Sequence, residues 1–372
     1  MKYVKSWFCI PTKLYDNNYD NFFNRARLIW KYVCFDRFNI LNEYSPYNIY
    51  PKFDPLPEFD LNDCSLENII LQRAEYYANN ADNGIAVAWS GGVDSTGIVC
   101  ALIEVGYPIE KINVICTKKS IEEYPLFYDF LKANRAKITI NGQYDEHVTD
   151  IYKTLTEDHI LLGWGADQLY HFYEVYNDRD YSNKPWKDCL RQLYFERGTS
   201  KYYEQDVEIY QQYTQLLNWN IYTFFDLCLM GNLCLKMSAL RQFFQCQCVD
   251  AKTNAKTHLF YDSTRFTNWA YMNSHVTRSY FEANNNRLYK PEIKNIIYSV
   301  TKDKQYLYNK GKHPSWGQQY NKQGHVCHFM LTVYDEDGYH QYVHKISKLM
   351  PHHLTSSFCQ NLFDHYMEPY LK

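Results

Sequence analysis

The sequence lacks three features that would place it quickly in a broad class of proteins. No stretch approaches the roughly 18 uninterrupted apolar residues of a membrane-spanning helix, so no membrane partner is expected. Neither charge sign dominates, because a net charge of −3 over 372 residues provides no overall basic field for a nucleic acid. The first twenty residues also lack the long apolar core of a secretory signal peptide.

Regular cysteine spacing is missing as well, although the chain has 12 cysteines. No C-x-x-C pair occurs, and the cysteines are scattered along the chain. We therefore expect a reduced, cytoplasmic protein in which most cysteines are small core residues. The sequence carries no indication of the oligomeric state.

What is present is a regular alternation of short apolar runs with segments of helical spacing. The expected strands are 84–89, 111–117, 136–140 and 159–163, and the expected helices are 65–80, 94–106, 120–134 and 144–156. Alternation of this kind implies βαβ units, and hence an α/β fold with a parallel sheet covered by helices on both faces. A hydrophobic content of 46% is sufficient for a sizeable core.

Residues at the ends of these segments predict where several helices begin and end. Ser65 is expected to be an N-cap, and Gly106 to close the helix that precedes it. Ser120 and Glu123 have the spacing of a capping box, with Pro125 inside the first turns of one helix.

The composition changes along the chain predict three parts. Residues 1–64, rich in aromatic residues, asparagine and proline, form an N-terminal appendage with a loop over 44–57. Residues 65–175 form the α/β core. Residues 176–372 form a mainly helical region on the substrate side.

The segment "AWSGGVDST" lies between the first expected strand of the core and its helix, where α/β proteins bind ligands. Its two glycines let a ligand approach the backbone, and successive N–H groups before a helix form a nest for an anion. An acidic residue in such a nest would repel a phosphate, and its presence is explained if it holds a Mg²⁺ ion that also binds the phosphate. The candidate phosphate-binding residues are Ser90, Gly91, Gly92, Ser95 and Thr96, with Asp94 as the metal ligand. An ordinary connection that binds no ligand is the alternative.

This turn is neither a Walker loop nor a G-x-G-x-x-G turn. S-G-G-x-D-S resembles instead the signature of the PP-loop, or N-type, ATP pyrophosphatases. The resemblance implies an adenine nucleotide alpha hydrolase-like fold that binds ATP and Mg²⁺. It also implies cleavage of ATP between its α and β phosphates, with AMP transferred to an oxygen of the substrate.

Three later segments are similar, in family order, to motifs of the asparagine synthetases. "ILLGWGADQLYHF" resembles G-E-G-A-D-E-L-F, which implies that Asp167 helps to hold Mg²⁺ and pyrophosphate. "HLFYDSTRFTNWA" resembles the P-F-L-D motif, with Asp262 at its aspartate. "YKPEIKNII" and "YLYNKGKHPSW" are similar to the K-x-x-L-R helix and the lysine-bearing loop after it. Lys310, with Lys312 as the alternative, then contacts the α-phosphate and pyrophosphate; two solvated surface lysines are the competing interpretation.

Two departures from the asparagine synthetase pattern bear on the second half of the reaction. Position 2 is Lys2 where those enzymes expose a cysteine, and the region before the turn is too short for a glutaminase domain. We therefore expect the nitrogen to come from ammonia or from an amine substrate, as in relatives similar to β-lactam synthetase or lasso-peptide cyclase. Trp164 replaces the glutamate of G-E-G-A-D and cannot act as a general base.

The replacement at Trp164 leaves three interpretations open. Another group can serve as the base, and Tyr170, His171 and Glu174 are near in sequence. The indole can stack on a flat substrate. The ligase activity can also have been lost.

The resemblance as a whole implies an amide-forming ligase that adenylates a small-molecule carboxylate and then accepts ammonia or an amine. A peptide or a nucleotide is an alternative substrate. The end of the second strand, near Cys116 and Thr117, is expected to border the adenosine. The alternative functions are adenylation of a nucleobase carbonyl, in tRNA or a nucleotide, and nucleotide binding without catalysis.

Overall fold

The computed structural model describes two sets of residues. Main chain and most side chains are described for 65–141, 151–170, 183–238, 240–241, 251–283 and 285–311, and residues 25–26 and 40 are described as well. The strands 3–10, 325–334 and 342–350 are described by their backbone. The chain divides into two compact units. Unit 1 comprises 1–54, 171–247 and 315–372, and unit 2 comprises 55–170 and 248–314.

Unit 2 contains a five-stranded parallel sheet with the strand order β4-β3-β2-β5-β6. Its strands are β2 (Ile85–Ala88), β3 (Ile112–Cys116), β4 (Lys137–Ile140), β5 (His159–Leu162) and β6 (Thr257–Leu259). The predicted α/β class and the first four strands are confirmed. The fifth strand was not predicted, because three residues leave too little pattern to recognise.

The strand order reverses between β2 and β5, which are neighbours in the sheet. The chain runs outward from β2 through β3 to β4, and then returns to form β5 and β6 on the other side. In open parallel sheets, ligands bind beyond the carboxyl ends of the strands at such a switch point. The two segments singled out in the sequence, 90–96 and 163–167, follow β2 and β5 directly. Both therefore begin beside the switch point.

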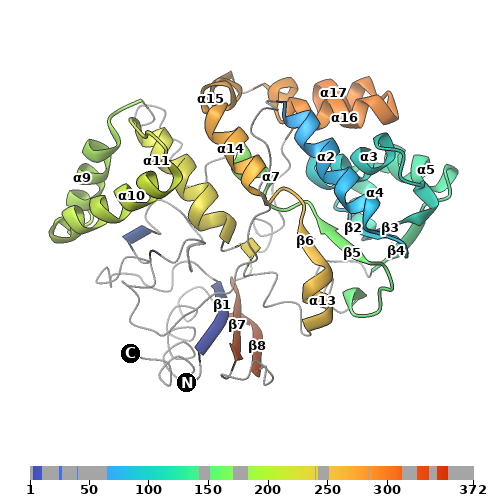
Figure 1. The fold of residues 1–372 in the computed structure, drawn as a ribbon, viewed down its shortest axis with the longest axis horizontal. Helices are drawn as coiled ribbons and strands as arrows, with labels where there is room; N and C mark the ends of the chain where they lie inside the picture. The colour runs from blue at the N-terminus through green and yellow to red at the C-terminus, as the bar shows by residue number, and fades with distance from the viewer. Residues whose placement is uncertain are drawn as a thin grey trace. The chain divides into compact units, whose positions relative to one another are not determined.

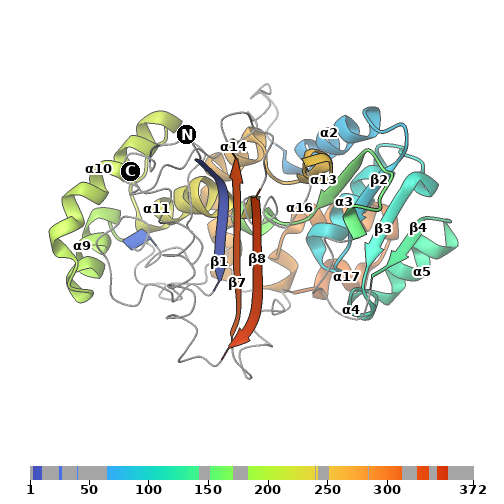
Figure 2. The same cartoon turned by 90° about the horizontal axis from the view of Figure 1, so that it is seen from below.

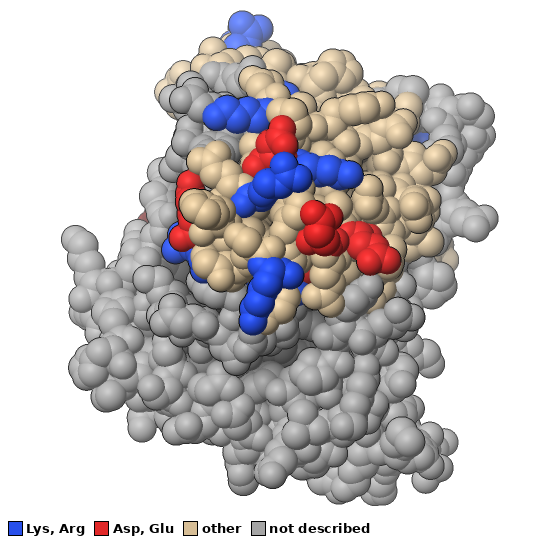
Figure 3. Space-filling view, turned by 90° about the vertical axis from the view of Figure 1, so that its left-hand side faces the viewer, with Lys and Arg blue, Asp and Glu red and all other residues tan. Residues whose placement is uncertain are grey.

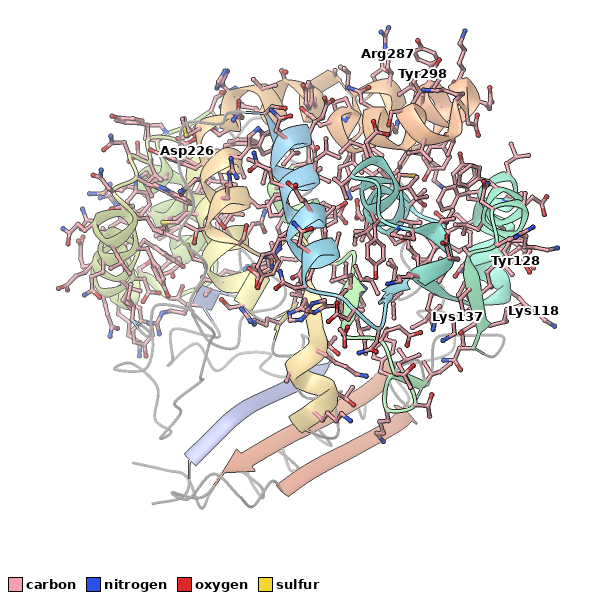
Figure 4. The ribbon with its side chains drawn as sticks, turned by 45° about the vertical axis from the view of Figure 1, so that its right-hand side comes forward. Lys118, Tyr128, Lys137, Asp226, Arg287 and Tyr298 are labelled. Carbon is pink, nitrogen blue, oxygen red and sulfur yellow. The ribbon has the colours of Figure 1, made fainter. Side chains whose placement is uncertain are left out.

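Three helices of unit 2 pack against one another: α2 (Leu66–Asn79), α3 (Val93–Glu104) and α16 (Pro291–Thr301). Figure 1 shows them gathered on one side of the strands. A Cβ on Gly97 of α3 would overlap the Cγ2 atom of Ile293, so the absence of a side chain at Gly97 permits the close contact with α16. Tyr298 of α16 projects away from the sheet in Figure 4.

Two of the predicted helix ends are confirmed. The hydroxyl of Ser65 accepts a hydrogen bond from the N–H of Asn68, as an N-cap does. Gly106 adopts φ +81°, and the N–H groups of Gly106 and Tyr107 donate to carbonyls in the last turn of α3.

The segment 120–134, predicted as one helix, forms two: α4 (Lys118–Glu123) and α5 (Pro125–Ala133). The prediction of one helix is wrong, because Pro125 has no N–H and disfavours helical dihedrals at the residue before it. Tyr124 accordingly has φ −144° and ψ 73°. The predicted capping box is also wrong. Thr117 is the N-cap. Its hydroxyl accepts a hydrogen bond from the N–H of Ser120, the third helical residue, and its own N–H donates to the hydroxyl of Ser120.

Short elements complete unit 2: η2 (Ile109–Lys111), α7 (Ala166–Leu169), α13 (Ala251–Lys256), α14 (Thr264–Met272), α15 (Ser274–Ala283), η6 (Asn286–Leu288) and α17 (Lys304–Asn309). The segment that resembles the P-F-L-D motif leads into α14, whose N-cap is Ser263. Most of the helix predicted over 144–156 lies outside the described residues. Within the described part of this range, residues 151–152 are helical.

Unit 1 contains an antiparallel sheet in addition to helices. Its strands are β1 (Tyr3–Ile10), β7 (His325–Tyr334) and β8 (Tyr342–Met350), in the order β1-β7-β8 (Figure 2). Its described helices include α9 (Trp186–Glu196), η4 (Ser200–Tyr202), α10 (Tyr203–Leu217), α11 (Phe224–Gly231) and η5 (Asn232–Lys236). The expectation of a mainly helical region over 176–372 therefore overlooked β7 and β8 in addition to β6. The pairing of β7 with β1, more than 300 residues away in the chain, is not visible in a local pattern.

Within unit 1, a buried ion pair connects the N-terminal segment to α10. The guanidinium of Arg25 donates two hydrogen bonds of 2.6 Å to the carboxylate of Asp206, and Tyr194 donates a third to the same carboxylate. Removal of either partner would leave an uncompensated charge in the core. Among the described residues of both units, no helix combines the length and the apolar content that a membrane crossing requires.

Candidate functional site

The segment 90–96 forms a tight turn over 90–92 at the carboxyl end of β2 and then the first residues of α3. Two hydrogen bonds close it, from the N–H of Ser90 to Ser95 Oγ at 3.0 Å and from the N–H of Gly92 to Ser90 Oγ at 3.3 Å. Gly91 has φ +80°, and Gly92 caps α3 in an extended conformation. The amino end of a 12-residue helix thus follows the turn directly, and its positive end favours an anion there.

The turn is enclosed so closely that two positions accept only glycine. A Cβ on Gly91 would overlap the carbonyl oxygen of Ser120 in α4. A Cβ on Gly163, at the end of β5, would lie 2.9 Å from the N atom of Ser95. The loops that follow β2 and β5 are therefore in contact, as expected of adjacent parallel strands.

The two acids predicted to bind metal meet at this contact, around a buried lysine. The Nζ atom of Lys290 lies 2.5 and 2.6 Å from the two carboxylate oxygens of Asp94 and 2.6 Å from Asp167 Oδ1. The side chain of Lys290 is fully buried, whereas those of Asp94 and Asp167 are 25% and 34% exposed. The ammonium thus lies behind a pair of carboxylates that are open to one side.

Lys290 is the residue of this cluster that sequence reasoning missed. It is the first lysine of "YKPEIKNII", the segment noted for its similarity to K-x-x-L-R, but nothing local distinguished it from Lys294. Its left-handed conformation, φ 52°, and the proline after it turn the chain into α16. Burial disfavours its charge, but the carboxylates of Asp167 and Asp94 outweigh this effect and raise the pKa of Lys290 well above its usual range.

The geometry of Asp94 and Asp167 fits the Mg²⁺ that the sequence predicts. Their carboxylates converge, and each oxygen has a second lone pair that the lysine does not use. Mg²⁺ needs one or two carboxylates and takes its other ligands from phosphates and water. Groups of three or more acidic, histidine or cysteine side chains suited to a metal do not occur among the described residues. A metal here would therefore depend on oxygens of a bound phosphate.

Lys310 lies at the same turn, although it follows the glycines by more than 200 residues. Its Nζ atom is 2.8 Å from Glu123 Oε1. The Glu123 side chain runs along the turn, since Cβ atoms on Gly91 and Gly92 would lie 2.8 Å from its Cβ and 3.7 Å from its Oε1. The sequence indicated Lys310, whereas Glu123 was assigned to a cap. Lys312 lies outside the described residues.

A second buried lysine lies in the same region. Lys294 is fully buried, and its Nζ donates a hydrogen bond of 2.5 Å to the carbonyl oxygen of Asn286. Burial, together with the nearby charge of Lys310, lowers the pKa of Lys294 to about 8. A neutral lysine at this position becomes favourable only above neutral pH.

The depressed pKa of Lys294 predicts a pH dependence of stability. The unfolded chain, with an ordinary lysine pKa of 10.5, binds more protons than the folded one above a pH of about 8. The free energy of unfolding should therefore rise between these two values, and Lys294→Met should remove that increment. Urea titrations at a series of pH values measure it, with Lys304→Met as the control because Lys304 is exposed and lies on α17. An equal rise in Lys294→Met and in the wild type would contradict the prediction.

Two of the predicted nucleotide-binding residues face inward in this structure. The hydroxyl of Thr96 accepts a hydrogen bond of 2.9 Å from Trp89 Nε1, and Thr96 is fully buried. Cys116 is also buried, which raises the pKa of its thiol to about 11, and its carbonyl accepts from the N–H of Asn141. These two residues would contribute to a ligand site through their backbone atoms and through the shape of the surface that they support, and not through their side-chain polar atoms.

The residues considered for the second half-reaction lie in different environments. Trp164 is 45% exposed, directly after Gly163. Tyr170 is buried, and its hydroxyl donates a hydrogen bond of 2.8 Å to Glu292. Asp262, close after β6, is 6% exposed. His171 and Glu174 lie outside the described residues.

Comparisons of the sequence with protein-family models and with curated proteins gave no match. The functional interpretation therefore depends on the motifs and on the geometry of unit 2.

Proposed function

We propose that the protein is a PP-loop ATP-dependent ligase, similar to the synthetase part of asparagine synthetases and with an adenine nucleotide alpha hydrolase-like core. One observation carries the proposal. The S-G-G-x-D-S turn, Asp167 and two lysines from distant segments come together at the carboxyl edge of a parallel sheet, at its switch point. Such an edge is where α/β proteins bind nucleotides.

In this proposal the pyrophosphate part of ATP occupies the turn. The N–H groups of Gly91 and Gly92 and the hydroxyls of Ser90 and Ser95 would be its hydrogen-bond donors, with the ligand replacing the bond from the N–H of Gly92 to Ser90 Oγ, and Lys310 would supply a positive charge. The adenosine lies toward Cys116 at the end of β3. These assignments use residues that already surround one turn.

Asp94 and Asp167 would hold Mg²⁺, which supplies positive charge to the phosphate oxygens when it is bound. Lys290 would keep the two carboxylates together, because its buried ammonium offsets their mutual repulsion.

The reaction proposed for this site has two balanced steps. An oxygen of a substrate carboxylate attacks the α-phosphorus of ATP, the bond to the β-phosphate oxygen breaks, and pyrophosphate leaves with that electron pair. The nitrogen of an amine or ammonia then attacks the acyl carbon, AMP leaves, and the nitrogen loses one proton. Lys310 would stabilise the charge that develops on pyrophosphate in the first step.

Among the residues that the structure describes, no observation favours adenylation of a nucleobase in RNA. That alternative calls for a basic channel in the helical part of the chain. Figure 3 views the left-hand side of Figure 1, where α9 and α10 lie, and the described basic and acidic side chains are interspersed on this face. Trp164 is exposed enough to stack on a flat substrate. A small aromatic acid and a free nucleobase are both flat enough for this contact.

Binding of ATP in the presence of magnesium tests the first part of the proposal. Asp94→Asn should weaken binding measured by calorimetry by about tenfold to hundredfold, because a charged ligand of the cation is lost. Asp129→Asn is the matched control, since Asp129 is exposed on α5. Equal binding by the wild type and Asp94→Asn would contradict the metal assignment.

Release of pyrophosphate tests the second part. The wild type should release pyrophosphate from ATP with at least one member of a pool of carboxylic acids and amines. Release with nucleosides alone would support the nucleobase alternative. Binding of ATP without release in any pool would favour a non-catalytic nucleotide-binding protein.

A further inference from the structure

We propose that Glu123 is a built-in competitor for the phosphate site, and that its carboxylate must give up Lys310 before a polyphosphate can bind. The inference rests on the proposed function, because it assumes that the turn receives a phosphate group. It assigns to Glu123 a role in setting the affinity and the charge selectivity of the turn.

The position of Glu123 is the first support. Its Oε1 atom is 2.8 Å from Lys310 Nζ, and a Cβ on Gly92 would be 3.7 Å from that same oxygen. The carboxylate thus lies beside the glycines whose N–H groups would bind an anion. An acid beside an anion site opposes the ligand unless it moves or is neutralised.

The surrounding contacts hold the partners of this ion pair in place. The ring of Tyr124, next to Glu123, stacks on Tyr306 of α17 with 4.1 Å between centroids. The hydroxyl of Tyr124 donates a hydrogen bond of 3.0 Å to Asp303, the N-cap of α17. Lys310 ends α17 and is 9% exposed. The helix that carries the lysine is therefore fixed against the helices that carry the glutamate, and the side chains alone have to separate.

The charges in the cluster explain why the pair forms without a ligand. Lys310 is close enough to Lys294 to lower the pKa of that buried lysine, so an unpaired Lys310 would face a like charge. Glu123 neutralises Lys310 until an anion replaces it. A monophosphate carries about two negative charges at neutral pH, one of which only replaces the charge of Glu123, whereas a pyrophosphate group brings further charges to the turn. The pair should therefore select for polyphosphates over monophosphates.

Calorimetric titration with magnesium pyrophosphate tests the inference. Glu123→Gln keeps the size of the side chain and removes the competing charge, so it should bind pyrophosphate about fivefold more tightly than the wild type. The affinity of Glu123→Gln for inorganic phosphate should increase by at least the same factor. The ratio of the pyrophosphate affinity to the phosphate affinity should therefore be smaller in this variant than in the wild type. Glu122→Gln is the matched control, because Glu122 is exposed on the same helix and should leave both affinities unchanged.

A second background separates competition from a structural role. In Lys310→Met the cation is gone, so adding Glu123→Gln should give a much smaller gain than it gives in the wild type. Unchanged or weaker binding by Glu123→Gln, while the wild type binds, would overturn the inference alone and indicate a ligand or structural role for Glu123. Absence of pyrophosphate binding by the wild type and by all variants would overturn the proposed function and the inference together.

Discussion

Replacement of Lys290 by methionine should lower the free energy of unfolding by about 3 kcal/mol, because it leaves two carboxylates facing each other without a cation. The ammonium is fully buried and lies within 2.6 Å of oxygens from both Asp94 and Asp167. Without it, each acid repels the other, and their convergence is lost. Urea unfolding measures the first effect, and ATP binding, which should fall below detection, measures the second.

A matched control and a compensating variant make this result specific to charge. Lys302 has the same left-handed backbone, φ 56° against 52°, but its side chain is exposed, so Lys302→Met should leave stability nearly unchanged. Adding Asp94→Asn to Lys290→Met removes one of the two opposed charges and should recover much of the lost stability without restoring ATP binding. A double variant as unstable as Lys290→Met would contradict the electrostatic explanation.

Replacement of Gly91 by alanine should remove nucleotide binding and lower the free energy of unfolding by about 2 to 4 kcal/mol. The position combines a backbone at φ +80° with a direct overlap between the new Cβ and the carbonyl oxygen of Ser120. The positive φ would strain the backbone of the turn, and the overlap with Ser120 would push α4 away from it. Thermal or urea unfolding and calorimetry with ATP measure the two losses.

Gly106 provides the control for backbone strain alone. It has nearly the same φ, +81°, but a Cβ there would meet nothing within 4 Å. Gly106→Ala should therefore cost about 1 to 2 kcal/mol and leave ATP binding intact. Equal losses in the two variants would show that the overlap at Gly91 is relieved easily, which would contradict the close enclosure of the turn.

The predictable part of the fold is the part with a local signal. The four strands from β2 to β5 were recognised because each is a short apolar run followed by a change to helical spacing. The caps at Ser65 and Gly106 were recognised because capping depends on a residue and its neighbours within one turn. The break at Tyr124 has a local signal too, which is Pro125. From the sequence this proline is expected within one helix, whereas in the structure it begins a second helix.

The parts that were missed depend on contacts between distant segments. Strand β1 pairs with β7 across more than 300 residues, and β6 is a three-residue strand defined mainly by its pairing with β5. Glu123 illustrates the same point within the site. From its neighbours it was assigned to a cap, and only the position of α17 makes it the partner of Lys310.

The sequence by itself determined the α/β class and the position of the glycine turn after a strand and before a helix, whereas Asp167 and Lys310 are candidate site residues through their resemblance to known motifs. The class and the position of the turn follow from periodicity and from the residue types in the turn. Only the tertiary structure decided that Lys290 forms ion pairs with both acids and that Glu123 forms an ion pair with Lys310. The physical reason is that a charge is tolerated in a buried position only beside its partner, and those partners come from segments brought together by the order of the strands and the packing of α16 and α17.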